Sequence, residues 1–266
     1  MKTSETIIQI RNVSKVFGKG AGQVGALDKV NLAVSKGEFT VLIGPSGCGK
    51  STLLYLLAGF ERPTEGEILL DGELIDKPGP DRGFVFQDYA LFPWQTVLGN
   101  VMFGLINNGW GKKEARGIAL EYINLVNLSG FEHAYPHTLS GGMKQRVGLA
   151  RALAYDPKVL LMDEPFGALD AQTRKCMQRE LVRIWEKTRK TVVFVTHSVI
   201  EAVFLADRII VMTARPGTVK GCIEVDVPRP RDYTGEDYLA VREKVLGLLE
   251  EEVLKEIRQD TASSQM

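Results

Sequence analysis

The apolar positions of this chain follow two periodicities that take turns along its length. Short runs of consecutive apolar residues suit strands covered on both faces, and apolar residues at every third or fourth position suit helices with one buried face. The runs occupy residues 40–43, 83–86, 159–162, 192–195 and 209–212, and the main helical patterns occupy residues 53–58, 143–154, 171–188 and 199–205. This alternation predicts an α/β domain with a largely parallel sheet.

Three segments outside this alternation have patterns of their own. Residues 7–10, 30–34 and 67–70 look like short strands, and Asp71-Gly72 is a strong hairpin signal, so a small antiparallel β layer is expected near the N-terminus. Residues 88–157 lose the strand pattern, which predicts a mostly helical insertion. Residues 238–257 are amphipathic and charged, which predicts a C-terminal helix followed by a polar tail.

Composition narrows the possibilities mainly by exclusion. The 266 residues contain 33 Lys and Arg and 33 Asp and Glu, so no overall field attracts nucleic acid, and no nucleic-acid partner is expected. The three cysteines are scattered and odd in number, which fits a reducing cytoplasm better than a disulfide framework. No apolar run is long enough to span a bilayer, so any link to a membrane is expected to come through a partner.

The glycine-rich loop between residues 40–43 and 53–58 is the strongest chemical signal. It has the form of a phosphate-binding loop, in the strand-to-helix context that such a loop requires. Glycines let backbone N–H groups approach phosphate oxygens, and the helix N-terminus adds partial positive charge. Lys50 is predicted to reach the β- and γ-phosphates of a nucleoside triphosphate, and Ser51 to ligate Mg²⁺. The predicted phosphate-binding residues are Gly44, Pro45, Ser46, Gly47, Cys48, Gly49, Lys50, Ser51 and Thr52.

Two simpler interpretations of this loop compete with that prediction. A glycine-rich turn before an ordinary helix would use the same residue types, but it would leave the complete motif unexplained. Cys48 within the loop could have a redox role, although here only its backbone is needed.

Two adjacent carboxylates, Asp163 and Glu164, follow the apolar run 159–162. Neighbouring carboxylates are common on surfaces. At the end of a buried strand, however, burying two negative charges costs free energy unless a cation is present. Together with a phosphate-binding loop, they predict that Asp163 holds Mg²⁺ and that Glu164 polarises the attacking water.

Polar residues follow two other predicted strands, and an aromatic residue precedes the glycine-rich segment 18–25. His197 and Gln87 are expected on the ligand side of the sheet, because ligands bind at the carboxyl ends of parallel strands. His197 is predicted to contact the phosphates, and Gln87 to sense Mg²⁺ or the water, although each could be a structural strand terminus. Phe17 could stack on a base, but an aromatic residue in a small β layer is more often part of the core.

Ser140-Gly141-Gly142 begins a second clear helix. A serine N-cap followed by glycines is a second anion site in one chain, although it could be only a well-capped helix. A second triphosphate nearby, and therefore a second copy of the protein, would favour the anion-site interpretation.

These motifs, in this order, resemble those of ATP-binding cassette (ABC) ATPases across residues 7–228. The resemblance implies a P-loop NTPase (RecA-like) core, with a helical subdomain at about 88–157 and a C-terminal helix and tail at 229–266. It also implies a head-to-tail dimer in which Ser140, Gly141 and Gly142 of one subunit close over the γ-phosphate of ATP held by the other. Phe17 would then stack on adenine, Glu164 would be the general base, His197 would contact the γ-phosphate and Asp170 would communicate across the dimer. Met143 stands where the family usually has Gln, and Phe17 where Tyr is more frequent.

The stretches 80–87, 91–97 and 214–217 are similar to a narrower branch, the ATPase subunits of nitrate, sulfonate and taurine importers. This resemblance implies an ATP-hydrolysing subunit on the cytoplasmic face of the cell membrane. Its partners would be a second copy of itself or a paralogous ATPase, two permease subunits and, indirectly, a solute-binding protein. The alternatives are an exporter ATPase with the same cassette, or a soluble ABC protein of DNA repair or translation. One phosphate-binding loop, no heptad run and zero net charge count against the last of these.

An aromatic cluster at residues 91–94 has two interpretations. On sequence alone it is expected to be buried inside the helical insertion. The family resemblance instead implies a groove that receives a short helix of the membrane subunit, with Trp94 exposed to it.

Overall fold

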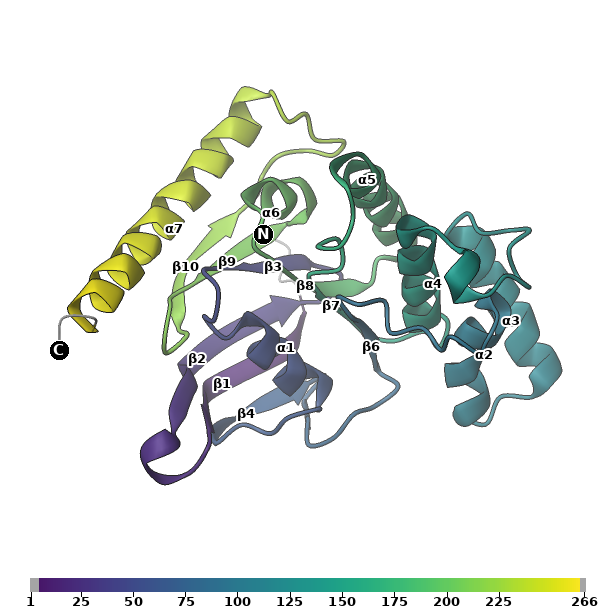
Figure 1. Cartoon of the computed structure of the whole chain (residues 1–266), viewed down its shortest axis with the longest axis horizontal. Coiled ribbons are helices and arrows are strands. Elements are labelled where there is room, and N and C mark those ends of the chain that lie inside the picture. The colour runs from purple at the N-terminus through teal and green to yellow at the C-terminus, as the bar shows by residue number, and fades with distance from the viewer. Residues whose placement is uncertain (1–4, 264–266) are drawn as a thin grey trace. The chain divides into compact units, whose positions relative to one another are not determined.

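The structure is a computed structural model that describes residues 5–263 (Figure 1). The described chain divides into two compact units. Unit 1 comprises the residues up to Pro78 together with those from Thr191 onward, and unit 2 comprises Gly79–Lys190. The predicted domain boundaries, 7–228 with a helical subdomain at 88–157, stay a prediction.

A four-stranded antiparallel sheet forms the first layer of unit 1. Its strands are β1 (Thr6–Phe17), β2 (Val24–Ser35), β4 (Glu65–Leu70) and β5 (Glu73–Leu74), in the order β2-β1-β4-β5. β1 and β2 are much longer than the predicted strands, because they continue past several register shifts to the pair Phe17–Val24. Asp71 and Gly72 adopt φ of 54° and 81° and join β4 to β5, as the hairpin signal predicted.

The second sheet of unit 1 carries the predicted parallel strands. β3 (Phe39–Ile43) lies between β8 (Thr191–Thr196) and β9 (Arg208–Met212) and pairs in parallel with both. Every residue of β3 and β8 is buried, which explains their unbroken apolar runs. β10 (Val219–Glu224) adds an antiparallel strand beside β9. The apolar pattern did not predict β10, because its residues are half-buried or exposed.

Three α-helices lie in the described part of unit 1. α1 (Lys50–Ala58) and α6 (Val199–Leu205) lie in the predicted stretches. Gly59 ends α1 in the left-handed conformation. α7 runs over Glu236–Ser263, so the helix continues past the predicted end at residue 257, and residues 264–266 lie outside the described range.

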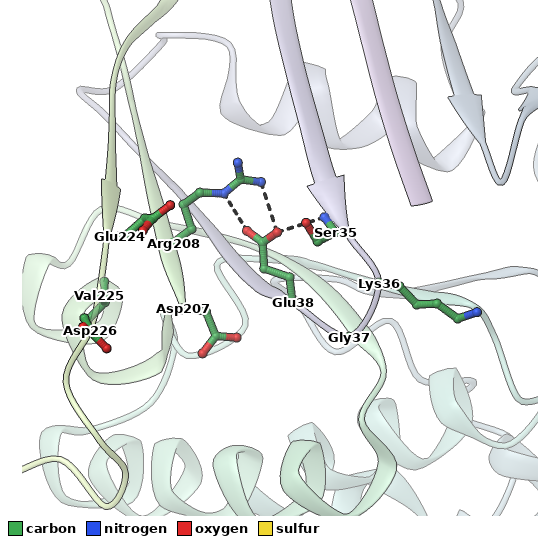
Figure 2. Close-up of a pocket in the computed structure, with 9 residues that line it drawn as sticks. All are labelled: Ser35, Lys36, Gly37, Glu38, Asp207, Arg208, Glu224, Val225 and Asp226. Atoms are coloured by element: carbon green, nitrogen blue, oxygen red, sulfur yellow. Dashed lines mark hydrogen bonds and ion pairs between the residues drawn. The ribbon is translucent and has the colours of Figure 1, made fainter. Parts of the chain in front are cut away.

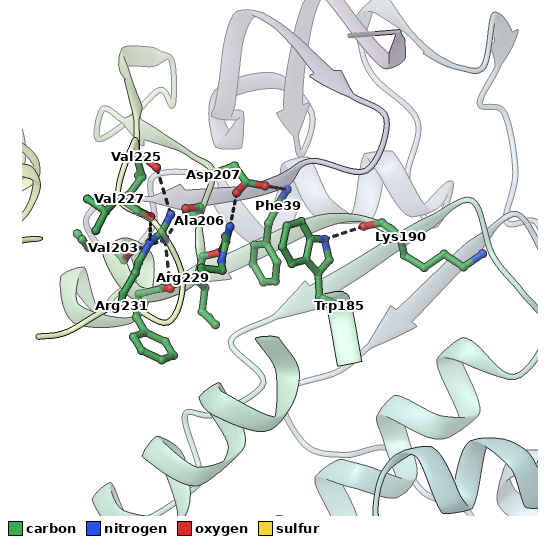
Figure 3. A network of polar contacts seen from close by, with 12 residues as sticks. Phe39, Trp185, Lys190, Val203, Ala206, Asp207, Val225, Val227, Arg229 and Arg231 are labelled. Atoms are coloured by element: carbon green, nitrogen blue, oxygen red, sulfur yellow. Dashed lines mark hydrogen bonds and ion pairs between the residues drawn. The ribbon is translucent and has the colours of Figure 1, made fainter. Parts of the chain in front are cut away.

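Two arginines attach the segment before α7 to the end of α6 (Figure 3). Arg231 is buried and donates to the carbonyls of Val203, Phe204 and Ala206, which lie at the C-terminus of α6. Arg229 donates to Asp207 at 2.6 Å. Burial lowers the pKa of Arg231 to about 10. These bonds satisfy helix carbonyls that have no partner within the helix.

Unit 2 combines a parallel strand pair with helices. β6 (Arg82–Val85) pairs with β7 (Val159–Asp163). Between them lie α2 (Val97–Asn107), α3 (Lys112–Leu125), the 3₁₀ turn Pro136–Thr138 and α4 (Gly141–Leu153), and α5 (Ala171–Thr188) follows β7. Residues 88–157 therefore contain no strand, as the helical spacing predicted. Within the described residues, no helix is both long enough and apolar enough to cross a membrane.

Candidate nucleotide-binding site

The loop between β3 and α1 has a backbone that few residues other than glycine adopt. Gly47 and Gly49 have φ of 74° and 86°. Gly49 is also the N-cap of α1, and no side chain caps this end of the helix. The N–H groups of the first turn are therefore not bound by a capping side chain, and they carry the positive end of the helix dipole.

Close packing also requires glycine in this loop. A Cβ on Gly44 would lie 2.7 Å from Cys48 Sγ and 2.8 Å from the Met212 carbonyl oxygen. A Cβ on Gly49 would lie 2.6 Å from a methyl carbon of Leu27. The loop is therefore held between β2 and the end of β9 in a conformation that larger residues would disrupt.

Lys50 is buried within its own loop, with 6% of its surface exposed. Its ammonium donates to the carbonyls of Gly44 and Pro45, each at 2.9 Å, and lies 3.6 Å from Cys48 Sγ. These acceptors are neutral, so they orient the charge without neutralising it, which fits an incoming anion. Burial raises the pKa of Cys48 despite the nearby ammonium, which argues against a reactive thiolate there.

Other predicted nucleotide residues also belong to unit 1. Ser51 and Thr52 are half-buried in the first turn of α1. Phe17 ends β1 with 39% of its surface exposed, so the expectation that it is a core residue is wrong. The Lys15 ammonium lies 4.8 Å from the centre of the Phe17 ring. An exposed ring at a strand end is able to stack on a base.

His197 is exposed at the carboxyl end of β8, and hydrogen bonds define the turn around it. The Thr196 hydroxyl donates to Glu201 at 2.5 Å and accepts from the Ser198 N–H at 3.0 Å. Ser198 in turn caps α6 by accepting from the Glu201 N–H. The turn that carries His197 is therefore supported by buried groups on both sides.

The predicted carboxylates lie together in unit 2. Asp163 is the last residue of β7 and is 6% exposed. Glu164 is half-buried and has a left-handed φ of 41°, which is strained for a residue with a side chain. The Gln87 amide nitrogen lies 3.5 Å from the position that a Cβ on Gly167 would occupy. Gln87 therefore lies beside the turn that begins at Glu164.

Ser140 and Asp170, also in unit 2, each cap a helix in their own chain. Ser140 Oγ accepts from the Met143 N–H at 3.3 Å at the start of α4. Asp170 accepts from the N–H groups of Gln172 and Thr173 at the start of α5. Hydrogen bonds from Thr173 and then Gln172 hold the pKa of Asp170 below its usual range. The roles of Ser140 and Asp170 in a dimer stay predictions.

The sequence-based reasoning missed the residue that supports the loop after Gln87. Tyr89 and Ala90 both have left-handed φ, 58° and 45°. Arg151 of α4 donates to their carbonyls at 3.1 and 2.6 Å. Burial lowers the pKa of Arg151. An arginine within a predicted helix is the only signal of this role in the sequence, because its partners lie some sixty positions away.

The cavity shown in Figure 2 does not contain any predicted nucleotide residue. It has a volume of about 600 Å³ and lies at the start of β3 and β9. Glu38 in its wall is paired with Arg208 and also accepts from the Ser35 N–H and the Thr40 hydroxyl. Its lining consists of Ser35, Lys36, Gly37, Glu38, Asp207, Arg208, Glu224, Val225 and Asp226.

The geometry of the loop fits the phosphate groups of a nucleotide. The loop is a cradle that a Cβ would fill at several positions, and its lysine is not neutralised by its neutral acceptors. Among the described residues, no three His, Cys, Asp or Glu side chains cluster as a metal site. Mg²⁺ does not need such a cluster, because water and phosphate oxygens usually supply most of its ligands. A buried strand leading into this loop and helix defines the chain as a P-loop nucleoside triphosphatase.

Comparison with known proteins narrows this class to one family. Residues 27–167 match the family described as ABC transporter. The uncharacterized ABC transporter ATP-binding protein MJ0412 of Methanocaldococcus jannaschii is 54% identical over 94% of both chains. The aliphatic sulfonates import ATP-binding protein SsuB of Bacillus cereus is 48% identical, over 90% of this chain and 94% of its own.

Solved structures agree with this result. The dimeric ATP-binding cassette MJ0796, in a post-hydrolysis state bound to ADP and Pi, has a TM-score of 0.72 at 36% identity, covering 84% of this chain and 100% of its own. CbiO1 from Clostridium perfringens, part of an ABC transporter complex, has a TM-score of 0.75 at 27% identity, covering 91% and 93%. The chain belongs to the ABC transporter family, as one of its ATP-binding, ATP-hydrolysing members.

Proposed function

We propose that this chain is the ATPase subunit of an ABC importer for a small anion such as nitrate, taurine or another sulfonate. The observation that carries the ATPase part is the phosphate loop. Its buried Lys50 donates to two neutral carbonyls, no side chain caps α1, and among the described residues no ion pair joins Lys50 to a carboxylate. The SsuB relatives and the branch motifs at 80–87, 91–97 and 214–217 support the importer part.

The two units are proposed to contribute different residues to ATP binding and hydrolysis. In unit 1, Lys50 and the α1 N–H groups bind the phosphates, Phe17 stacks on adenine and His197 contacts the γ-phosphate. In unit 2, Glu164 polarises the attacking water, and the Gln87 amide interacts with Mg²⁺ or with that water. The half-buried position of Glu164 and the left-handed backbone that holds it support the role of a placed base.

Mg²⁺ belongs to the same proposal. Ser51 and Asp163 are the residues that would hold it, with Gln87 as a further ligand. The ion, when bound, neutralises charge that develops on the phosphate oxygens. Hydroxyl and carboxylate oxygens are the donor types that Mg²⁺ prefers.

The N-terminus of α4 is proposed to act on a second copy or a paralogous ATPase. Ser140, Gly141 and Gly142 would close over the γ-phosphate held by the other subunit. The dimeric cassette MJ0796 supports an assembly of this kind. Asp170 would communicate across the same dimer.

The aromatic cluster in unit 2 is proposed as the surface that meets a permease subunit. Trp94 is 71% exposed, so the interpretation of this cluster as buried is wrong for Trp94. The Phe92 ring lies 5.7 Å from that of Trp94 and 4.3 Å from that of Phe103. Exposed neighbouring aromatic rings are typical of residues that dominate binding energy at interfaces.

The test of the importer function is reconstitution with a permease and a solute-binding protein from the same organism. Trp94→Ala should abolish assembly and uptake while ATP hydrolysis by the isolated subunit stays within about threefold. Trp110→Ala is the matched control, because Trp110 is also exposed, at 41%, but follows the far end of α2. Wild-type uptake by Trp94→Ala would contradict the docking surface. Recovery of ribosomes or DNA in place of a membrane partner would contradict the importer.

A further inference from the structure

The turn between β9 and β10, residues 213–218, supports the importer proposal by its sequence, but none of its residues has a chemical role there. Thr213 and Thr218 close it on both sides. The Thr213 N–H donates to the Thr218 carbonyl at 3.0 Å, and the Thr218 N–H donates to Thr213 Oγ1 at 2.9 Å. The two hydroxyls lie 2.9 Å apart. The turn is therefore a defined structure and not a free loop.

Gly217 attaches this turn to β2 and packs it against the phosphate loop. Its N–H donates to the Ala26 carbonyl, and its own carbonyl accepts from the Asp28 N–H, each at 3.0 Å. A Cβ on Gly217 would lie only 2.1 Å from the carbonyl oxygen of Cys48. Glycine is therefore required at 217 for the turn to lie this close to the phosphate loop.

Arg215 is the side chain that this arrangement brings to the loop. Its Nη2 and Nε lie 3.2 and 3.3 Å from the position that a Cβ on Gly47 would occupy. The residue is exposed. Within the described chain, no hydrogen bond or ion pair joins the guanidinium to a carboxylate. Its charge is therefore beside the phosphate loop and available to an anion.

We propose that Arg215 is a second cation of the phosphate loop, which strengthens binding of the nucleotide's phosphate chain together with Lys50. Lys50 approaches from the buried side of the loop, and Arg215 lies on its exposed side, next to Gly47. Guanidinium is well suited to phosphate, because its planar donors match the spacing of phosphate oxygens. The inference rests on the proposed phosphate role of this loop and adds a residue to it.

A purely structural role for Arg215 makes a different prediction. A side chain that only covers the Gly47 backbone would be replaced well by Met, which has similar length and no charge. A side chain that attracts phosphate would be replaced by Lys but not by Met, and its effect would grow with the number of phosphates.

The first experiment measures binding of ATP, ADP and AMP by calorimetry for the wild type, Arg215→Met and Arg215→Lys. Arg215→Met should weaken ATP binding by about three- to tenfold, with smaller losses for ADP and AMP, and Arg215→Lys by less than about twofold. The difference in ATP affinity between the wild type and Arg215→Met should shrink as the salt concentration rises from about 0.05 to about 0.5 M. Arg62→Met is the matched control, because exposed Arg62 lies beyond the opposite end of the nine-residue α1.

The second experiment uses the wild-type protein and does not depend on how a variant folds. Phenylglyoxal modifies accessible arginines, and mass spectrometry of peptides reports each site. ATP and inorganic tripolyphosphate should protect Arg215, adenosine should not, and Arg62 should react equally in all samples. Wild-type ATP affinity in Arg215→Met, or no protection by tripolyphosphate, would overturn the role of Arg215. Unchanged ATP affinity in Lys50→Ala would instead contradict the phosphate loop itself.

Discussion

The N-termini of α1 and α4 use similar residues in two different ways. At α1, the N-cap is Gly49 in a left-handed conformation, and no side chain caps the helix. At α4, the N-cap is Ser140 in an extended conformation, and its hydroxyl accepts from the Met143 N–H at 3.3 Å. Both helices are preceded or begun by glycines, so residue type alone does not separate them.

The difference indicates which of the two helix N-termini can bind an anion without help from a second chain. α1 leaves its first N–H groups without a capping side chain and adds a buried ammonium from Lys50. α4 is already capped, so a phosphate that approaches it must compete with Ser140 for the same donors. The comparison supports the proposal that α1 binds the nucleotide and that α4 and Glu164 act on nucleotide that is already bound.

The largest expected effect separates hydrolysis from binding. Glu164→Gln should lower the turnover number for ATP by about 10²- to 10⁴-fold, because the amide cannot accept a proton from water. ATP affinity should stay within about threefold, since the phosphate contacts of unit 1 remain. Steady-state hydrolysis and calorimetry measure the two quantities. A wild-type rate of ATP hydrolysis in this variant would contradict the role of Glu164 as the general base.

The next effect concerns α1. Lys50→Ala should weaken ATP binding by about 10- to 100-fold, because a charge-assisted hydrogen bond to phosphate is lost. The matched control is Lys144→Ala, which removes a half-buried lysine from the first turns of α4. Equal losses of ATP affinity in the two variants would mean that the two helix ends do not differ as proposed.

A third variant tests the partner-dependent role of α4. Ser140→Arg, made together with Glu164→Gln, should bind ATP normally but fail to form the ATP-bound dimer, because the larger side chain occupies the place of the opposing γ-phosphate. Sedimentation velocity with and without ATP measures this directly. A normal ATP-bound dimer of the double variant would contradict the shared site.

The smallest expected effect is on stability. Ser140→Ala should lower the free energy of unfolding by about 1 kcal/mol, since the Met143 N–H loses its cap. Ser140→Asn, which retains a capping oxygen, should restore most of it. Urea unfolding monitored by circular dichroism provides both values. No loss in Ser140→Ala would mean that the cap is energetically unimportant.

Local rules made much of the fold and of the site predictable. The apolar runs of β3 and β8, the helices α5 and α6, the Asp71-Gly72 turn and the Ser140 cap each depend on residues within a few positions of one another. Backbone sterics and nearby hydrogen bonds determine such features, so they are visible in one stretch of sequence. The phosphate loop belongs to this group, because its glycines and lysine lie in eight consecutive residues.

Features that depend on distant partners could not be predicted in this way. β10 is strand only because it pairs with β9, and Phe17 and Trp94 are exposed although their types suggested burial. Arg215 contacts a loop at Gly47, far away in sequence, and nothing in its own neighbourhood indicates that contact. The sequence alone therefore determined the kind of chemistry and the segments that carry it. Only tertiary packing decided which side chains are exposed and which charges meet within each unit, because burial and long-range electrostatics depend on the whole fold.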